Sequence, residues 1–165
     1  MEKDEVVRNL EVLIKKVKEG VVDPGRVSLA LNGFLGGFQH DKTRDGWELV
    51  EDVGETKLLS VNELELAPFL LKRERSVNGE ELVTRSKKMQ ANLGQLQAEY
   101  LLDRQDEIPK EWRKHHLHFP GTIWRDRDGD RNIFCLCWGG RRWYLMFRWL
   151  DDDFDSGSRL LCPRE

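Results

Sequence analysis

The feature that most constrains the fold is the alternation of apolar side chains over residues 117–150, which is interrupted by two turn signals. Asp128-Gly129 and Gly139-Gly140 are dipeptides typical of two-residue β-hairpin turns. If both form such turns, residue 127 faces residue 130, and residue 138 faces residue 141. The pattern therefore predicts a three-stranded antiparallel β-meander.

This register assigns most of the apolar residues of the meander to one face of the sheet. It places Phe134 opposite both Ile123 and Leu145, and Leu136 opposite Trp143. The predicted first face comprises Ile123, Phe134, Leu136, Trp138, Trp143, Leu145, Phe147 and Trp149. The predicted second face comprises Trp124, Ile133, Cys135, Cys137, Arg142, Tyr144, Met146 and Arg148. We expect the first face to pack on helices, and the second to be covered by the N-terminal helices or left open for a partner.

The first third of the chain has helical periodicity followed by a polar stretch. Apolar residues at steps of three and four predict a helix over residues 4–19, and Asp23-Pro24 is typical of the start of a second helix. We expect these helices to form a helical hairpin over residues 1–38. The turn-rich residues 39–60 are predicted to be a linker or a short strand.

Residues 61–165 are predicted to form one α+β domain that ends in the meander. Residues 61–78 are ambiguous because Pro68 interrupts any regular element. Helices are predicted over residues 79–90 and 95–106. The fold class is therefore α+β, with N-terminal helices followed by a C-terminal three-stranded antiparallel β-meander.

Charge and hydropathy exclude some classes of function. The chain has 27 basic and 30 acidic residues, so its net charge of −3 provides no bulk attraction to nucleic acid or to an anionic membrane. The apolar stretch from Leu66 to Leu71 is too short to span a bilayer. The acidic N-terminus is unlike a secretory signal, and three cysteines do not form a disulfide framework. We therefore expect a cytoplasmic protein with no membrane partner.

Two carboxylate-rich segments are candidates for cation binding. Residues 126–130 begin like a calcium loop, but the loop requires Gly at its sixth position and Glu at its twelfth, where this chain has Arg131 and Cys137. Asp151, Asp153 and Asp155 are the candidate metal ligands of a metal-dependent hydrolase. The alternative interpretation of this second segment is a solvated, charged strand end.

Two further motifs have simpler structural interpretations. Candidate zinc ligands are present, but they lack the usual Cys-X-X-Cys and His-X₃-His spacings, and buried cysteines that pack as small apolar groups are favoured. These ligands are His115, His116, His118, Cys135 and Cys137. The two helices around Asn92-Leu93-Gly94 resemble a helix-turn-helix, but the second helix is acidic, so a plain helical hairpin is favoured.

The arginines and tryptophans of the meander are the most suggestive functional feature, because all eight basic residues after position 120 are Arg. Arg, Trp and Tyr are the residues that most often anchor protein interfaces. The predicted interaction surface is Trp124, Arg125, Arg142, Tyr144 and Arg148. Our leading hypothesis is a non-catalytic interaction or regulatory module that binds another protein or a second copy of itself, without a cofactor. Single-stranded nucleic-acid binding on the same surface is the alternative, and a Trp-rich core with Arg at its rim is the purely structural interpretation.

Several short stretches between about residue 78 and residue 161, which is about half the chain, are similar to stretches of other proteins. They are Ala91-Asn92-Leu93-Gly94, Ala98-Glu99, Leu101-Leu102, Glu107-Ile108-Pro109, Glu111-Trp112-Arg113, residues 119–124, residues 138–143 and Trp149-Leu150. With these stretches the chain resembles a group of short uncharacterised bacterial proteins, and the Trp-rich C-terminal stretch is the most specific part. The resemblance implies no activity, cofactor or catalytic residue.

Overall fold

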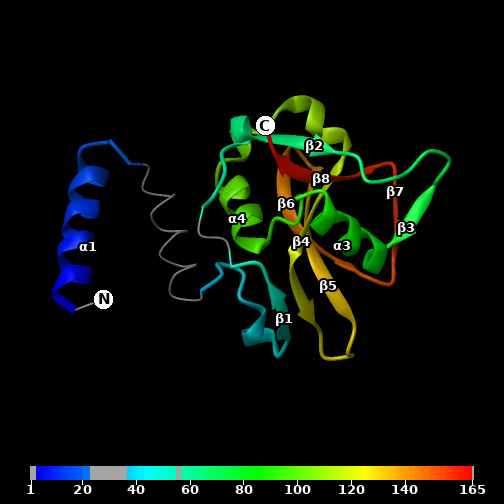
Figure 1. Cartoon of the computed structure of the whole chain (residues 1–165), viewed down its shortest axis with the longest axis horizontal. Coiled ribbons are helices and arrows are strands. Elements are labelled where there is room, and N and C mark those ends of the chain that lie inside the picture. The colour runs from blue at the N-terminus through cyan, green and yellow to red at the C-terminus, as the bar shows by residue number, and fades with distance from the viewer. Residues whose placement is uncertain (1–2, 23–36, 55–56, 165) are drawn as a thin grey trace.

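The computed structural model describes residues 3–22, 37–54 and 57–164, and it shows an α+β fold (Figure 1). A mixed six-stranded sheet has the strand order β2-β8-β4-β5-β6, and β1 pairs with β4 outside this path. The sheet strands are β1 (Glu48–Asp52), β2 (Leu64–Ala67), β4 (His116–Arg125), β5 (Arg131–Gly139), β6 (Arg142–Trp149) and β8 (Ser158–Pro163). The short strands β3 (Ser76–Asn78) and β7 (Asp153–Asp155) form a separate antiparallel pair.

Three α-helices lie in the described part of the chain: α1 (Lys3–Lys18), α3 (Gly79–Lys88) and α4 (Gln95–Asp103). The helices predicted over residues 79–90 and 95–106 are thus confirmed as α3 and α4. Short 3₁₀ helices are η1 (Lys42–Asp45), η2 (Val61–Glu63), η3 (Gln105–Glu107) and η4 (Lys110–Lys114). The second helix of the predicted N-terminal hairpin, over residues 23–38, lies almost entirely outside the described residues. None of the described helices is long and apolar enough to cross a bilayer.

The two faces of the sheet are buried by different helices. Leu101 of α4 packs with Phe134 and Leu136 in one hydrophobic cluster. Leu82 of α3 packs with Ile133 in a second cluster. Because successive residues of a strand point to opposite faces, α4 and α3 cover opposite sides of the sheet. Part of the second face, for which we expected either the N-terminal helices or an open surface, is therefore covered by α3.

The predicted meander is confirmed as β4-β5-β6, but both of its registers differ from the prediction. In the β5–β6 hairpin, Phe134 pairs with Phe147, and Leu136 pairs with Leu145, a shift of two residues from the predicted pairs. A shift of two preserves the face of every side chain. The turn residues are Gly140 and Arg141, with φ of 57° and 79°, a pair of positive values typical of a type I′ turn.

In the part of β4 from Ile123 onward, the β4–β5 register differs by one residue from the prediction, and this changes the face of Ile123 and Trp124. Ile123 pairs with Ile133 instead of Phe134, and residues 126–130 form a five-residue connection instead of a two-residue turn. Trp124 therefore lies on the first face, where it is 1% exposed, and Ile123 lies on the second. Our assignment of these two residues was wrong because a one-residue shift reverses the face of a strand.

A bulge in β4 allows both halves of this strand to contribute to one core. Phe119 pairs with Phe134 and Ile123 pairs with Ile133, so residues 120–122 have no partner in β5. The N–H of Gly121 instead donates to the carbonyl of Leu93, at 2.9 Å. Bulges insert residues into one strand and re-aim its side chains. As a result, odd-numbered Phe119 and even-numbered Trp124 are buried in the same cluster.

We expected the meander to be the last element of the fold, but two further strands, β7 and β8, follow it. Strand β8 follows it and lies inside the sheet, antiparallel to β2 and parallel to β4. Residues 61–78, which the sequence left ambiguous, contain η2, β2 and β3, and the predicted linker contains η1 and β1. Figure 1 shows β8 (red) close to β2, and the strand order places it inside the sheet, between β2 and β4.

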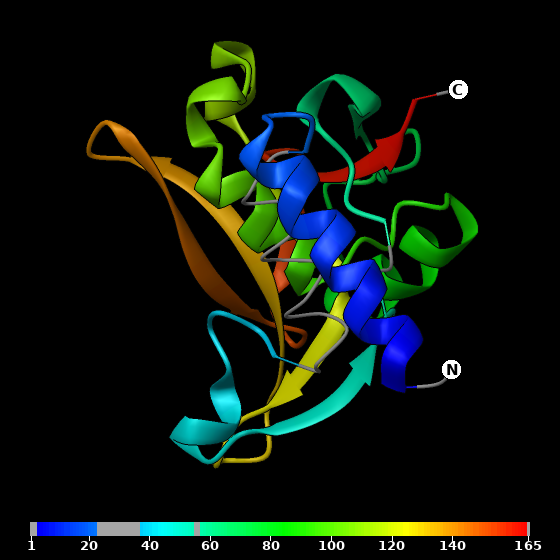
Figure 2. The ribbon, with the colours of Figure 1, turned by 90° about the vertical axis from the view of Figure 1, so that its left-hand side faces the viewer.

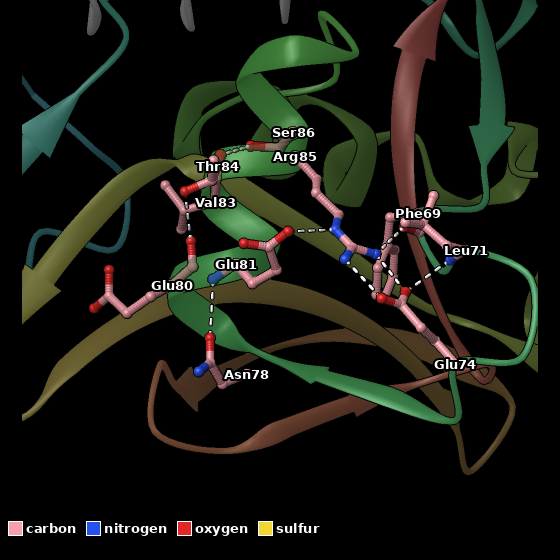
Figure 3. Close-up of polar contacts among 10 residues, drawn as sticks. All are labelled: Phe69, Leu71, Glu74, Asn78, Glu80, Glu81, Val83, Thr84, Arg85 and Ser86. Carbon is pink, nitrogen blue, oxygen red and sulfur yellow. Dashed lines mark hydrogen bonds and ion pairs between the residues drawn. The ribbon is translucent and has the colours of Figure 1, made fainter.

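Helix α3 is held at both ends by polar contacts (Figure 3). The side chain of Asn78 caps its N-terminus by accepting the N–H of Glu81 at 2.9 Å. Near the other end, the Arg85 guanidinium donates to both carboxylate oxygens of Glu74, at 2.5 and 2.9 Å, and to the carbonyl of Phe69. This forked contact ties the loop before β3 to the helix, and it lowers the pKa of Glu74 to about 2.

Candidate functional site

Three of the five predicted surface residues already have partners in the fold. Trp124 is buried, and its indole N–H donates to the side chain of Gln95 at 2.8 Å. Arg125 forms an ion pair with Glu48 of β1 at 2.9 Å. Arg148 lies 3.3 Å from Asp152, and its guanidinium lies 5.6 Å from the ring centre of Phe154. The structure does not bring these three residues together on one surface.

The other two predicted residues, Arg142 and Tyr144, lie together on β6. Both point to the second face of the sheet and are exposed, with Tyr144 at 39%. Both line a hollow of about 460 Å³ between β6 and the segment that contains η1. This hollow, with its floor, its open strand edge and its opposite wall, is the candidate site.

Strand β6 forms one edge of the six-stranded sheet. The backbone N–H of Trp143 points away from β5 and donates to Oε1 of Gln105, at 2.9 Å. On the opposite side of the strand, the N–H of Leu150 donates toward β5, to the carbonyl of Arg131. Because backbone groups of a strand alternate in direction, the N–H groups of Leu145 and Phe147 also point outward. Among the described residues, none pairs with them.

The floor of the hollow is apolar, and its opposite wall is polar. Phe134, Leu102, Leu145 and Phe147 contribute the apolar surface. The wall comprises Gln39, His40, Asp41, Lys42, Arg44 and Asp45. Figure 2 shows the tip of the β5–β6 hairpin extending beyond the helices, while the segment that carries η1 lies toward the other end of β6. The hollow therefore runs along the open edge of the sheet.

A buried carboxylate positions the start of this wall. Glu99 of α4 is fully buried, and its Oε1 accepts the backbone N–H of His40 at 2.8 Å and the side chain of Gln95 at 2.8 Å. Its Oε2 accepts the N–H of Gln39 at 3.0 Å. A buried carboxylate is stable only when its oxygens are satisfied in this way. These bonds fix the backbone of residues 39–40 to α4.

The charges around the hollow are unequally neutralised. Lys42 pairs with Asp45, and its ammonium also lies 4.8 Å from the ring centre of Trp47 and 5.0 Å from that of Phe147. Asp41 accepts both the N–H and the hydroxyl of Thr43. By contrast, neither Arg44 nor Arg142 forms an ion pair with any described residue. The hollow therefore presents two guanidinium groups that have no direct ion pair among the described residues, although Arg44 lies near enough to Asp41 to lower the pKa of that carboxyl; such groups favour carboxylate or phosphate ligands.

Sequence reasoning missed most of this site. It identified Arg142 and Tyr144 but assigned residues 39–45 to a linker or short strand, and it read Gln105 as part of a helix. No local pattern connects residues 39–45 to β6, because their proximity depends on Glu99 of α4. The observation that β6 is an edge strand also required the position of β8 in the sheet.

The candidate metal ligands are distributed over several places. Asp153 and Asp155 are exposed residues of β7, on either side of buried Phe154. Cys135, Cys137 and His116 lie close together, and His118, which pairs with Cys135 across β4 and β5, contacts Ser158 at 3.1 Å. Within the described ranges, no three His, Cys, Asp or Glu side chains are grouped in a way that could hold a metal ion.

Comparison with known proteins adds no name to this geometry. The chain matches no family model, no curated protein and no solved structure, so the site is interpreted from its own residues.

Proposed function

We propose that this protein is a non-catalytic interaction module that binds an extended segment of a partner protein along the outer edge of β6. The observation that carries the proposal is the unpaired edge at Leu145 and Phe147, which lies beside the hollow. An open edge offers main-chain donors and acceptors to a strand from another chain, a recognition mode known as β-augmentation. An edge that is not used in this way is an aggregation hazard, which natural proteins usually block.

The side chains around the edge indicate the chemistry of the segment. An added strand alternates its side chains between the two faces of the sheet. On the face with Phe134 and Phe147, apolar side chains of the partner would enter the hollow. Carboxylates would be attracted to Arg142 and Arg44, which have no ion partner among the described residues. We therefore infer an extended partner segment that alternates apolar and acidic residues.

Amide hydrogen exchange tests the proposed binding mode directly. The ligands are synthetic peptides of about eight residues that alternate Leu or Val with Glu, together with scrambled peptides of the same composition. In the free protein, the amides of Leu145 and Phe147 should exchange fast, while that of Met146, which points toward β5, should be protected. Saturating peptide should protect Leu145 and Phe147 and leave Met146 unchanged. Binding without new protection at these two amides would contradict β-augmentation.

Substitutions at the site separate its side-chain contribution from folding. Arg142→Ala and Tyr144→Ala should each weaken peptide binding by about 5- to 50-fold, corresponding to about 1–2 kcal/mol, with little change in unfolding midpoint because both side chains are exposed. Arg141→Ala is the matched control, since this neighbouring exposed arginine does not line the hollow. Equal effects of all three substitutions would show only a general loss of positive charge.

Single-stranded nucleic acid is the alternative ligand, and it gives a different result. A labelled oligonucleotide would bind with an affinity that falls steeply as salt rises, because phosphate contacts release counterions. The peptide mode predicts a weaker salt dependence, since apolar contacts and main-chain hydrogen bonds contribute to it. Oligonucleotide binding at low salt, with no peptide binding, would replace the proposed function by this alternative.

A further inference from the structure

A cluster of two thiols and an imidazole lies on the second face of the sheet, outside the hollow. Leu117 pairs with Leu136, which brings His116 of β4 next to Cys137 of β5. His116 Nδ1 lies 3.0 Å from Cys137 Sγ. Cys135, two residues earlier on the same strand, points to the same face, and its Sγ lies 3.5 Å from that of Cys137. The three groups are thus in direct contact in the order His116, Cys137, Cys135.

The surroundings make the two thiols unequal. The hydrogen bond between the two thiols, with Cys135 as donor when Cys137 is ionised, and the charges of His116 and Arg148 lower the pKa of the Cys137 thiol below its ordinary value, although burial opposes them. The hydrogen bond to Cys137, together with burial, raises the pKa of the Cys135 thiol. The thiolate therefore forms preferentially on Cys137, next to His116.

None of the other described groups around the cluster places a negative charge beside the Cys137 thiolate. Cys135 faces His118 on β4, and burial lowers the pKa of His118 to about 3, so its imidazole is neutral at physiological pH. On β6, Cys137 faces Tyr144 and Cys135 faces Met146. No described Asp or Glu contacts either thiol. The cluster therefore has a cationic and not an anionic environment, which favours a thiolate.

We propose that His116, Cys137 and Cys135 form a peroxide-reactive dithiol site, in which Cys137 is the nucleophile and Cys135 resolves it. The thiol proton of Cys137 passes to Nδ1 of His116, the thiolate attacks one oxygen of hydrogen peroxide, the O–O bond breaks, and the hydroxide that leaves takes this proton back from His116 to form water. Cys135 sulfur then attacks the resulting sulfenic sulfur, and the S–O bond breaks. The hydroxide that leaves takes the thiol proton of Cys135 and forms the second water. The sum is two thiols and one peroxide giving one disulfide and two waters.

The strand geometry sets the properties of this disulfide. Residues two apart in a strand have Cα atoms about 6.4–6.8 Å apart, at the upper end of the range that disulfides span. Bond formation also requires the sulfurs to approach from 3.5 Å to about 2.05 Å. Such a bond strains β5 and is easily reduced, a property of regulatory and not of structural disulfides. Cys137 is only 3% exposed, so the site suits a small oxidant such as peroxide.

Oxidation of the full chain, followed by mass spectrometry, tests the site. One equivalent of hydrogen peroxide at pH 7 should lower the mass of the protein by two hydrogen atoms. The loss should map to a disulfide between Cys135 and Cys137 within one peptide, and mild dithiothreitol should reverse it. Cys162, whose thiol pKa is raised by burial and by the nearby Glu65, should stay reduced and serves as the internal control. In Cys135→Ser, one equivalent of peroxide should leave Cys137 as sulfenic acid, and a second equivalent should oxidise it to sulfinic acid, which dithiothreitol does not reverse.

The role of His116 has its own readout. Because His116 is exposed, His116→Ala should leave folding intact, slow disulfide formation at pH 7 roughly five- to tenfold and move the midpoint of the rate–pH profile upward. His115→Ala, at the adjacent imidazole, should leave the midpoint unchanged. Two results would overturn the proposal: oxidation of Cys162 before the cluster, or a rate–pH profile that His116→Ala does not shift. Neither result bears on peptide binding at β6, which is measured with the reduced protein.

Discussion

The indole N–H of Trp124 donates a hydrogen bond of 2.8 Å to Oε1 of Gln95, and this contact connects the sheet to the wall of the candidate site. The amide nitrogen of Gln95 donates in turn to Glu99 at 2.8 Å and to the carbonyl of His40 at 3.1 Å. The backbone N–H of Gln95 reaches Thr122, whose hydroxyl contacts Asp52 of β1 at 2.6 Å. The backbone and side chain of Gln95, at the start of α4, thus join β1, β4 and the segment after residue 38.

The first prediction concerns the contribution of this contact to stability. Trp124→Phe keeps an aromatic ring but removes the only donor of the indole, which leaves Gln95 Oε1 buried without this partner. We expect a loss of about 1–3 kcal/mol in the free energy of unfolding, measured by urea denaturation. Trp149→Phe is the matched control: Trp149 is 55% exposed, and its substitution should change stability by less than about 0.5 kcal/mol. Equal effects at the two positions would refute a specific role for the Gln95 contact.

The second prediction concerns the bulge of β4. A Cβ on Gly121 would lie 2.1 Å from the carbonyl oxygen of Asn92, a backbone atom that cannot move aside without displacing the loop between α3 and α4. Gly121→Ala should therefore lower the unfolding free energy by about 1–3 kcal/mol. At Gly157, the nearest atom is the end of the flexible Asp155 side chain at 3.1 Å, so Gly157→Ala should cost less. The prediction is contradicted if the urea midpoint of Gly121→Ala is equal to or higher than that of Gly157→Ala.

The third prediction concerns the pH dependence of stability. The pKa of Glu74 is lowered to about 2, mainly by hydrogen bonds from Arg85 and from the backbone of Leu71, against an ordinary value of 4.5. The folded state therefore binds this proton more weakly than the unfolded state. The stability that the ionised carboxylate contributes is fully present above pH 4.5 and is lost as the pH falls toward 2. The wild type should exceed Glu74→Gln in urea midpoint at pH 7, and the difference should shrink below pH 4.5.

A double-mutant cycle identifies the source of this effect. In an Arg85→Ala background, the substitution Glu74→Gln should have a smaller effect on the midpoint at pH 7, because the forked ion pair is already absent. An unchanged effect would mean that Glu74 acts through Leu71 alone.

The sequence predicted the meander correctly but not all of its faces. The predicted register of the β5–β6 hairpin was wrong by two residues, but every side chain was still assigned to the correct face, since the side chains of a strand alternate with a period of two. At Trp124 the predicted β4–β5 register was wrong by one residue, so this side chain, which we expected at the surface, is buried in the core. Pro120 and Gly121 are residues typical of a bulge, but they do not specify the register on either side of it, which depends on the close approach of Leu93 and Asn92 from another part of the chain.

The candidate site depended still more on tertiary structure. Arg142 and Tyr144 were identifiable because arginine and tyrosine on a strand near a tight turn are typical of interfaces. Their neighbours in the hollow were not, since residues 39–45 are placed beside β6 by contacts with residues far away in the chain, such as the bonds of Glu99 to Gln39 and His40 and the contact of Lys42 with the Phe147 ring. Similarly, the contact of Cys137 with His116 depends on the pairing of two strands, and the sequence shows only that the three groups exist.

The sequence alone therefore determined the α+β class, the helices α3 and α4 and the existence of the meander, because local periodicity and turn residues specify these elements. Only the tertiary structure decided which strand is an edge, which face Trp124 occupies and which distant residues meet at β6. The physical reason is that strand order and register depend on contacts between residues far apart in the chain, such as β8 with β4, which no local pattern records.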